Sequence, residues 1–306
     1  MHLGNGIICP VTGIPMLAIA GVTAFYAFKK AKKDFSKDKI FPAIAITGLV
    51  FALQMINFAI LTTGSSGHIV GAILLSAILG PFAAFLAMCA ILIVQSVFFA
   101  DGGLLALGCN IFNMGFLACF VAYPLIFKPL ADKNKPFLAA LSASVAALQL
   151  GSIAVVIEGG LSGAIAASSI LNFTGLMQAI HIPIGIAEGV VTGAIVIIAK
   201  VIDSKKLSIS FAGLSLILAG IIAPYASSKP DGLEWSLLNI SNSVVMQTQG
   251  QLYTFAESIQ SKTALFSNMP FTLGNIAGLF TVGFIMLLTC ILINKKMVTA
   301  DAKEIQ

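Results

Sequence analysis

The stretch that decides the fold is His68-Ile-Val-Gly-Ala-Ile-Leu-Leu-Ser-Ala-Ile-Leu-Gly-Pro-Phe-Ala-Ala-Phe-Leu-Ala-Met-Cys-Ala-Ile-Leu-Ile-Val-Gln-Ser-Val-Phe-Phe99. These 32 residues contain no Asp, Glu, Lys or Arg, and only Gly80-Pro81 interrupts them. A membrane-spanning helix needs about 20 apolar residues, so the run is long for one span, and its first part, 68–79, is short for one. Whether the run counts as one crossing or two sets the orientation of every later segment.

The composition identifies an integral membrane protein built from helices. Of the 306 residues, 58% are hydrophobic and 9% are charged, whereas about 25% of the residues in soluble domains are charged. Cutting the apolar runs at glycine, proline and lysine clusters predicts nine transmembrane helices, at 11–28, 41–61, 68–79, 82–99, 104–127, 137–157, 177–199, 207–224 and 271–294. The predicted fold class is therefore an all-α integral membrane protein.

The lysines predict the orientation of the chain, because cytoplasmic loops carry an excess of positive charge. Fifteen of them follow the first, fifth, seventh and ninth predicted spans: Lys29, Lys30, Lys32, Lys33, Lys37, Lys39, Lys128, Lys133, Lys135, Lys200, Lys205, Lys206, Lys295, Lys296 and Lys303. With two spans in 68–99, all fifteen lie on one side of the membrane, and only Lys229 and Lys262 lie on the other. We therefore expect the N-terminus outside and the C-terminus in the cytoplasm. Gly80-Pro81 then forms a short inner turn or breaks a helix.

The chain divides at Asp203-Ser204-Lys205-Lys206. Residues 1–203 form a predicted seven-span transmembrane domain. Residues 204–306 form a two-helix accessory module with a polar outer loop, 225–270, that holds the only tryptophan, Trp235.

Several function classes lack their sequence signatures. The 17 basic residues are all lysine, whereas arginine is the favoured residue for phosphate and nucleic acid, so no nucleic-acid partner is expected. The sequence has no Gly-x-x-x-x-Gly-Lys-[Ser/Thr] loop for nucleotide hydrolysis and no His-Glu-x-x-His zinc protease motif. The chain is thus not expected to be an enzyme.

The three histidines, His2, His68 and His181, all fall at or near the predicted outer face. We expect Met1 to be retained, so that its amine, the His2 amide nitrogen and the His2 imidazole close adjacent five- and six-membered chelate rings. A second imidazole, from His68, completes a square-planar nitrogen set of the kind that suits Ni²⁺ and Cu²⁺, and cobalt is held similarly. The alternative for both histidines is an ordinary polar residue at the membrane surface.

Five further residues are expected to support this set. Asp101 precedes two glycines in an outer turn, and Asn110 and Asn113 share one helix face, where buried amides fix loop geometry. Glu188 lies seven residues after His181 on one helix, so it is expected to pair with His181 or to orient an imidazole. On the same helix, Gly185, Gly189 and Gly193 form a ridge that favours close helix packing.

An enzymatic alternative comes from Gly64-Ser65-Ser66-Gly67 at the start of an apolar run. With His181 as base, Ser66 resembles the nucleophile of a rhomboid-type intramembrane serine protease. This interpretation requires Ser66 to lie within hydrogen-bond reach of the His181 imidazole.

Taken in order, these motifs resemble the CbiM/NikM family of substrate-binding membrane components of energy-coupling-factor importers for cobalt and nickel. The resemblance rests on Met1-His2, Thr63-Gly64-Ser65-Ser66-Gly67-His68, Gly80-Pro81, Asp101-Gly102-Gly103-Leu104, Ala106-Leu107-Gly108, Asn110-Ile111-Phe112-Asn113-Met114-Gly115 and His181 to Glu188. Pro230-Asp231-Gly232-Leu233-Glu234 is similar to the accessory module often fused behind this domain. The start Leu3-Gly4-Asn5-Gly6 departs from the starts of the family, which leaves the choice of metal open.

The resemblance implies Met1, His2 and His68 as the metal ligands, with Co²⁺ or Ni²⁺ as transported substrate and no organic cofactor. It also implies a transmembrane coupling subunit and paired ATPase subunits as partners, in the plasma membrane of a prokaryote. Small residues at Ala20 and Ala24, and at Ala139, Ala143 and Ala147, are predicted to let a partner helix approach closely.

Overall fold

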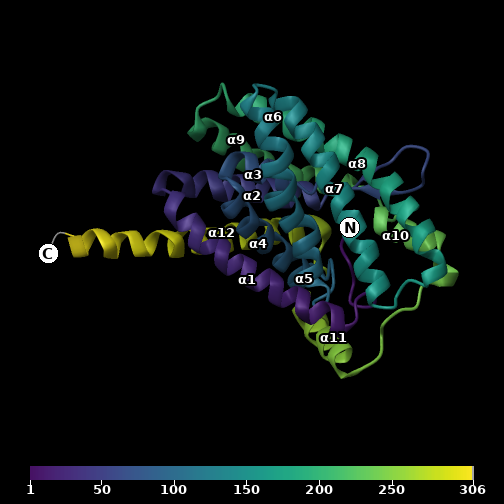
Figure 1. Cartoon of the computed structure of the whole chain (residues 1–306). Coiled ribbons are helices and arrows are strands. Elements are labelled where there is room, and N and C mark those ends of the chain that lie inside the picture. The colour runs from purple at the N-terminus through teal and green to yellow at the C-terminus, as the bar shows by residue number, and fades with distance from the viewer. Residues whose placement is uncertain (305–306) are drawn as a thin grey trace.

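The computed structural model describes residues 1–304, and the side chains of all of these except Asp34 and 295–304. Figure 1 shows a bundle of helices from which α12 extends at the C-terminal end. The helices are α1 (Pro10–Asp34), α2 (Ile40–Gln54), α3 (Ala72–Leu79), α4 (Pro81–Phe99), α5 (Leu107–Asn110), η2 (Ile111–Phe127), α6 (Lys128–Asp132), α7 (Pro136–Leu161), α8 (Ile170–Ala199), α9 (Ser204–Ile217), α10 (Gly232–Asn239), α11 (Gln251–Thr263) and α12 (Phe271–Glu304). Short helical turns are η1 (Lys37–Lys39), η3 (Ala167–Ser169), η4 (Leu218–Ile222), η5 (Ala223–Tyr225) and η6 (Ser241–Ser243).

Seven helices among the described residues are long and apolar enough to cross a membrane, which confirms an all-α membrane protein. They cover Pro10–Lys33, Pro81–Phe99, Leu107–Asp132, Pro136–Leu161, Ala167–Ala199, Ser204–Tyr225 and Phe271–Asn294. The other two of the nine predicted spans are shorter helices. Helix α2 has 15 residues and α3 has eight, and eight residues rise only about 12 Å. Thus α3 does not cross the membrane as a continuous helix.

The run 68–99 is broken at Gly80, which has a φ of 79° that glycine adopts without steric cost. Pro81 then begins α4, as proline often does at the first position of a helix. Helices α3 and α4 pack against each other. The run therefore forms two helices and not one long span, in agreement with the predicted break.

Helix α7 packs against α8, where the glycine ridge of α8 lies, and also against η2. A Cβ atom added at Gly189 would lie 2.6 Å from the Leu141 Cα atom, so the glycine allows the two backbones to approach closely. Ala139 and Ala143 on α7 are fully buried. The prediction that this alanine ridge binds a partner helix is wrong, because packing within the protein already covers it. Ala20 on α1 is also buried, at 5% exposure.

The predicted outer segment 225–270 is more structured than a loop. It contains α10 and α11, and Figure 1 places both at the end of the bundle near the N-terminus. Two short antiparallel strands of two residues each, β1 (Phe58–Ala59) and β2 (Ser66–Gly67), lie beside this segment. Ser66 forms a parallel bridge with Asp231, and its N–H donates to Pro230 O at 2.8 Å. The C-terminal module thus forms backbone hydrogen bonds with the loop that precedes His68.

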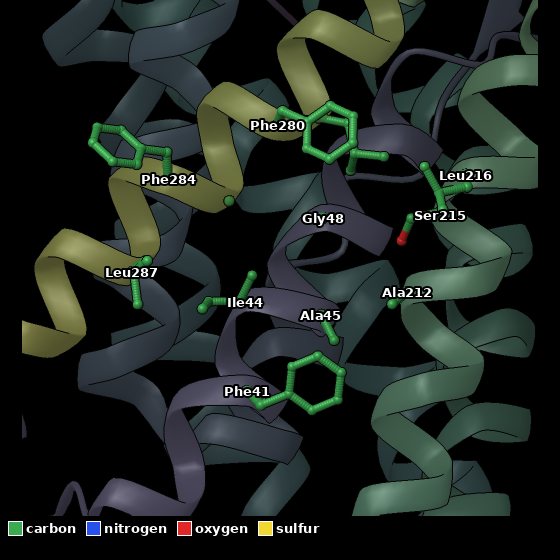
Figure 2. A pocket seen from close by; sticks show the side chains of 12 residues that line it. Phe41, Ile44, Ala45, Gly48, Ala212, Ser215, Leu216, Phe280, Phe284 and Leu287 are labelled. Atoms are coloured by element: carbon green, nitrogen blue, oxygen red, sulfur yellow. The ribbon is translucent and has the colours of Figure 1, made fainter.

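An apolar groove of about 380 Å³ lies between α2, α9 and α12 (Figure 2). Phe41, Ile44, Phe280 and Phe284 are among its lining side chains. The hydroxyl of Ser215 in the same groove donates to Phe211 O at 2.6 Å, so it leaves no free polar group there. This lining fits a surface that faces hydrocarbon.

Candidate metal centre

The N-terminal segment packs inside the protein, and hydrogen bonds hold its backbone in place. Met1 is 4% exposed and Leu3 is fully buried. The Leu3 N–H donates to Asn110 Oδ1 at 2.8 Å, and Asn110 Nδ2 donates back to Leu3 O at 3.1 Å. Gly103 N also donates to Leu3 O, at 2.8 Å. Asn110 and the turn after Asp101 therefore hold the backbone next to His2.

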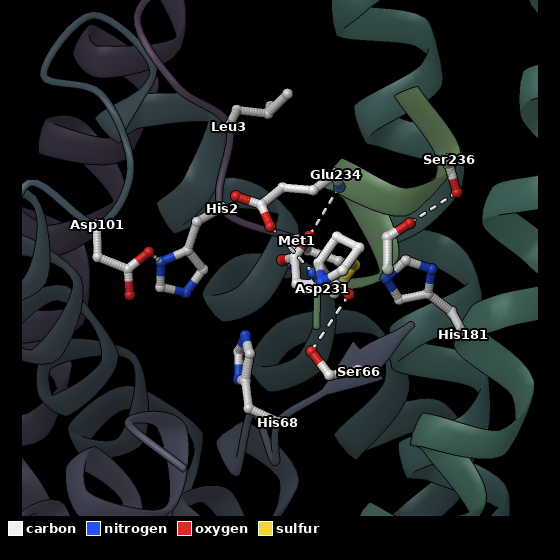
Figure 3. A network of polar contacts seen from close by, with 12 residues as sticks. Met1, His2, Leu3, Ser66, His68, Asp101, His181, Asp231, Glu234 and Ser236 are labelled. Carbon is white, nitrogen blue, oxygen red and sulfur yellow. Dashed lines mark hydrogen bonds and ion pairs between the residues drawn. The ribbon is translucent and has the colours of Figure 1, made fainter. Parts of the chain in front are cut away.

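The imidazoles of His2 and His68 meet edge to face, with ring centroids 5.2 Å apart and an interplanar angle of 85°. Figure 3 shows both rings in one pocket beside Met1. The His2 side chain is 6% exposed, and His2 Nε2 is buried without a hydrogen-bond partner in the described structure. Buried polar atoms usually have partners, so the unpaired Nε2 marks a position open to a further polar partner, separate from the Nδ1 atom that a chelate with the His2 amide would use.

His68 is set up to donate a ring nitrogen. Its Nδ1 lies 3.5 Å from Ile69 O, an orientation that leaves Nε2 for another partner. Burial, together with the nearby N-terminal ammonium and His2, lowers the pKa of His68 to about 3. The His68 ring is therefore neutral at neutral pH, which is the form that binds metal.

Asp101 contacts His2 directly. Its Oδ1 lies 2.8 Å from His2 Nδ1. Burial acts to raise the pKa of Asp101, but the charge of His2 and the contact with it outweigh burial, so the pKa lies below its ordinary value. Only Nδ1 is close enough to the His2 amide nitrogen to close a six-membered chelate ring. Chelation therefore requires the ring to exchange its contact with Asp101 for the metal.

Asp231 is a site residue that the sequence analysis missed. Its Oδ2 lies 3.1 Å from the Met1 amine, and its Oδ1 accepts from Glu234 N at 2.8 Å (Figure 3). Burial acts to raise the pKa of Asp231, but the N-terminal ammonium and the hydrogen bond from the Glu234 backbone, with smaller contributions, together outweigh burial, so the pKa lies well below its ordinary value. The available signal was the capping pattern Asp231-x-x-Glu234, which marks a helix start and says nothing about a distant amine.

Three of the predicted supporting residues, Asn113, Glu188 and His181, make contacts other than those expected. Asn113 Nδ2 donates to Glu158 Oε2 at 2.6 Å, so it pairs a buried carboxylate. Glu188 Oε2 accepts from Val70 N at 2.7 Å and holds the turn after His68. The predicted pairing of Glu188 with His181 is wrong.

His181 turns toward its own helix. Its Nδ1 donates to Met177 O at 2.7 Å. Ser66 Oγ donates to Lys229 O at 2.7 Å. The two side chains that a serine protease would require are each satisfied by a backbone carbonyl, and no hydrogen bond joins them in the described structure. The arrangement gives the protease alternative no support.

Within the described residues, no group of three or more His, Cys, Asp and Glu side chains could hold a metal ion. A site at His2 and His68 therefore depends on backbone nitrogens as well as side chains. The residues present offer them, because the Met1 amine and the His2 amide are adjacent in the chain and lie beside His68.

The comparisons with known proteins agree with this architecture. The family described as "Cobalt uptake substrate-specific transmembrane region" matches residues 2–205, and the family described as "PDGLE domain" matches residues 205–294.

Relatives and a solved structure extend the match. The cobalt transport protein CbiM of Acetoanaerobium sticklandii is 31% identical over 202 residues, which are 63% of this chain and 81% of that protein. The fused nickel transport protein NikMN of Rhodobacter capsulatus is 30% identical over 122 residues, 40% of this chain and 35% of that one. The crystal structure of a truncated transition metal transporter matches with a TM-score of 0.57 and 32% identity, over 65% of this chain and 98% of that chain. The chain therefore belongs to the CbiM family of transmembrane proteins for cobalt uptake, with a PDGLE domain behind the family region.

Proposed function

We propose that this protein captures Co²⁺ or Ni²⁺ as a transported substrate, through the Met1 amine, the His2 amide and imidazole, and the His68 imidazole. The observation that carries the proposal is the edge-to-face contact of His2 and His68 beside a buried N-terminal amine. Binding would release protons, because the amine and the amide must give them up. Four nitrogens in one plane favour Ni²⁺ geometrically, and the relatives include both cobalt and nickel transport proteins.

The proposal includes the transport context. We infer that the chain is the substrate-specificity subunit of an energy-coupling-factor importer in a prokaryotic plasma membrane. A transmembrane coupling subunit and paired ATPase subunits supply the energy, since this sequence lacks a nucleotide-binding loop. When α3 and the non-helical chain before it together make one crossing, the lysine distribution supports an outer N-terminus and a cytoplasmic C-terminus, with His2 and His68 toward the side from which metal arrives.

Calorimetric titration of the purified protein with Ni²⁺ and with Co²⁺ tests the ligand set. Wild type is expected to bind one metal ion tightly, and His2→Ala and His68→Ala are each expected to abolish binding. Asn294→Ala is the control, because Asn294 is also buried but bonds Cys290 O of its own helix, away from the proposed ligands. Wild-type affinity in either His2→Ala or His68→Ala would exclude the proposed ligands.

A further inference from the structure

A cavity of about 720 Å³ adjoins the proposed metal site. His2, His68 and Asp101 from the first domain line it, and Asp231 and Glu234 line it from the C-terminal module. Ser228 also lines it. Ser228 and Glu234 are exposed, so the cavity reaches the protein surface. Without the C-terminal module, this cavity would lack one whole wall.

The cavity is acidic. Asp101, Asp231 and Glu234 are its ionisable carboxylates, and no lysine is among its lining residues. The unpaired, buried Nε2 of His2 belongs to a ring on the same wall, independently of the carboxylates. The Met1 ammonium pairs with Asp231 and His2 contacts Asp101, so Glu234 is the lining carboxylate without an ion-pair partner among the described residues. A cleft with a net charge of one sign concentrates ions of the opposite sign and raises association rates by about 10–10³. The lining thus suits a small cation.

Exposure decreases in steps from the surface toward the amine. Glu234 is exposed, the Asp231 side chain is 17% exposed, and Met1 is 2% exposed at its side chain. Each carboxylate is also fixed in place: Glu234 Oε2 accepts from Asp231 N at 3.1 Å, and Asp231 Oδ2 contacts the amine. The carboxylates therefore form a short rigid series that leads inward (Figure 3).

We propose that this cavity is the route by which a divalent cation reaches the site, and that Glu234 is the carboxylate that draws the cation in. The inference rests on the proposed function. It assigns the C-terminal module a kinetic role, which is to speed capture without supplying one of the four nitrogen ligands.

Stopped-flow mixing of the full-length protein with Ni²⁺ tests the inference, and Trp235 is a built-in fluorescent reporter next to Glu234. Glu234→Gln removes the charge but keeps the capping pattern at the start of α10, since glutamine also serves there. The association rate constant is expected to fall about tenfold at low salt, with a weaker dependence on ionic strength. The dissociation rate and the absorption band of bound Ni²⁺ should stay unchanged.

Asp132→Asn is the control, because it removes one carboxylate charge from an exposed ion pair with Lys128 that is not in the cavity lining. If Glu234→Gln and Asp132→Asn bind Ni²⁺ at the same rate and with the same salt dependence as wild type, the inference is wrong. Absence of stoichiometric Ni²⁺ and Co²⁺ binding by wild type would instead refute the proposed function. The two failures are therefore distinguishable.

A second measurement tests the route by blocking it. Cys9 is half-buried and the other four cysteines are buried, so a Cys9→Ala background leaves few reactive thiols. A bulky maleimide on Ser228→Cys, in the cavity wall, is expected to slow Ni²⁺ association strongly. The same reagent on Ser261→Cys, which is exposed on α11 and not in the cavity lining, should have no effect. Equal association rates in both labelled proteins would place the route elsewhere.

Discussion

The α-amine of Met1 lies 3.1 Å from Oδ2 of Asp231, although the two residues are 230 positions apart in the chain. The contact joins a proposed metal ligand to the C-terminal module. An amine bound to a metal keeps two N–H groups, so Asp231 can accept from it in the loaded protein as well. Carboxylates in this outer position orient the ligand and raise its basicity.

Asp231→Asn is therefore expected to weaken Ni²⁺ or Co²⁺ affinity by about 10–100-fold without changing the one-to-one stoichiometry. Calorimetric titration measures both. Asp203→Asn, a helix cap at the domain boundary, is the control for loss of one acidic residue. Unchanged affinity in Asp231→Asn would show that the amine is positioned without this carboxylate.

Inserting one proline between Met1 and His2 is expected to abolish metal binding. The inserted residue separates the amine from His2 and has no amide hydrogen to lose, so the amine and the imidazole no longer close adjacent rings on one metal. Metal titration, with circular dichroism to confirm helix content, is the measurement. A proline inserted between Thr248 and Gln249, both exposed, is the matched control. Normal binding by the first insertion would remove the amine from the ligand set.

Substitutions at Asn110 and Asn113 are expected to have different effects, the first on metal affinity and the second on stability. Asn110→Ala releases Leu3, which follows His2, so metal affinity should drop by about 10–100-fold. Asn113→Ala leaves the buried Glu158 without its amide partner, so the free energy of unfolding should fall by about 1–3 kcal/mol while affinity changes little. Thermal unfolding in detergent and metal titration distinguish the two. The reverse pattern would contradict the assigned contacts.

Metal loading is expected to release about two or more protons per ion, one each from the amine and the amide. His68 contributes none near neutral pH, because its pKa is lowered to about 3 and its ring is already neutral. Affinity should therefore rise with pH across the neutral range. A pH indicator in weak buffer measures the release, with His68→Ala as the non-binding control. Release of fewer than about one proton would exclude an ionised amide.

Ala143→Leu is expected to destabilise the isolated protein, because Ala143 is fully buried on α7. Overpacking of this kind costs about 1–3 kcal/mol. Ile153→Leu on the same helix, where Ile153 is 40% exposed, should be neutral. Thermal unfolding in detergent is the measurement. Wild-type stability of Ala143→Leu, combined with loss of partner binding, would restore this ridge as an interface.

The sequence was informative where local chemistry decides the structure. Gly80-Pro81 predicted the break in 68–99, and a glycine with positive φ followed by a helix-starting proline is what the structure has. His2 and His68 were paired from the coordination chemistry of a histidine beside an amine. The structure places their rings together.

Long-range contacts were not readable from the sequence. Glu188 and His181 share a helix, which made them look like partners, but Glu188 bonds the Val70 amide and His181 bonds Met177 O. The alanines on α7 have the pattern of a docking ridge, and only their burial in the folded protein shows that the ridge is already covered. Asp231 carried no local sign of its contact with Met1, since such a contact depends on how two domains meet.

The Met1–Asp231 contact also orders events in time. At about 5–20 residues per second, the ribosome makes Asp231 roughly 10–50 s after Met1. During that interval the apolar side chains of Leu3, Ile7 and Ile8 have no Leu233 to pack against, although they share one cluster in the finished protein. A chain that stops before Asp231 can insert its early helices but leaves its amine without a carboxylate. The pocket around the Met1 amine can therefore assemble only after translation has entered the second domain and passed Asp231.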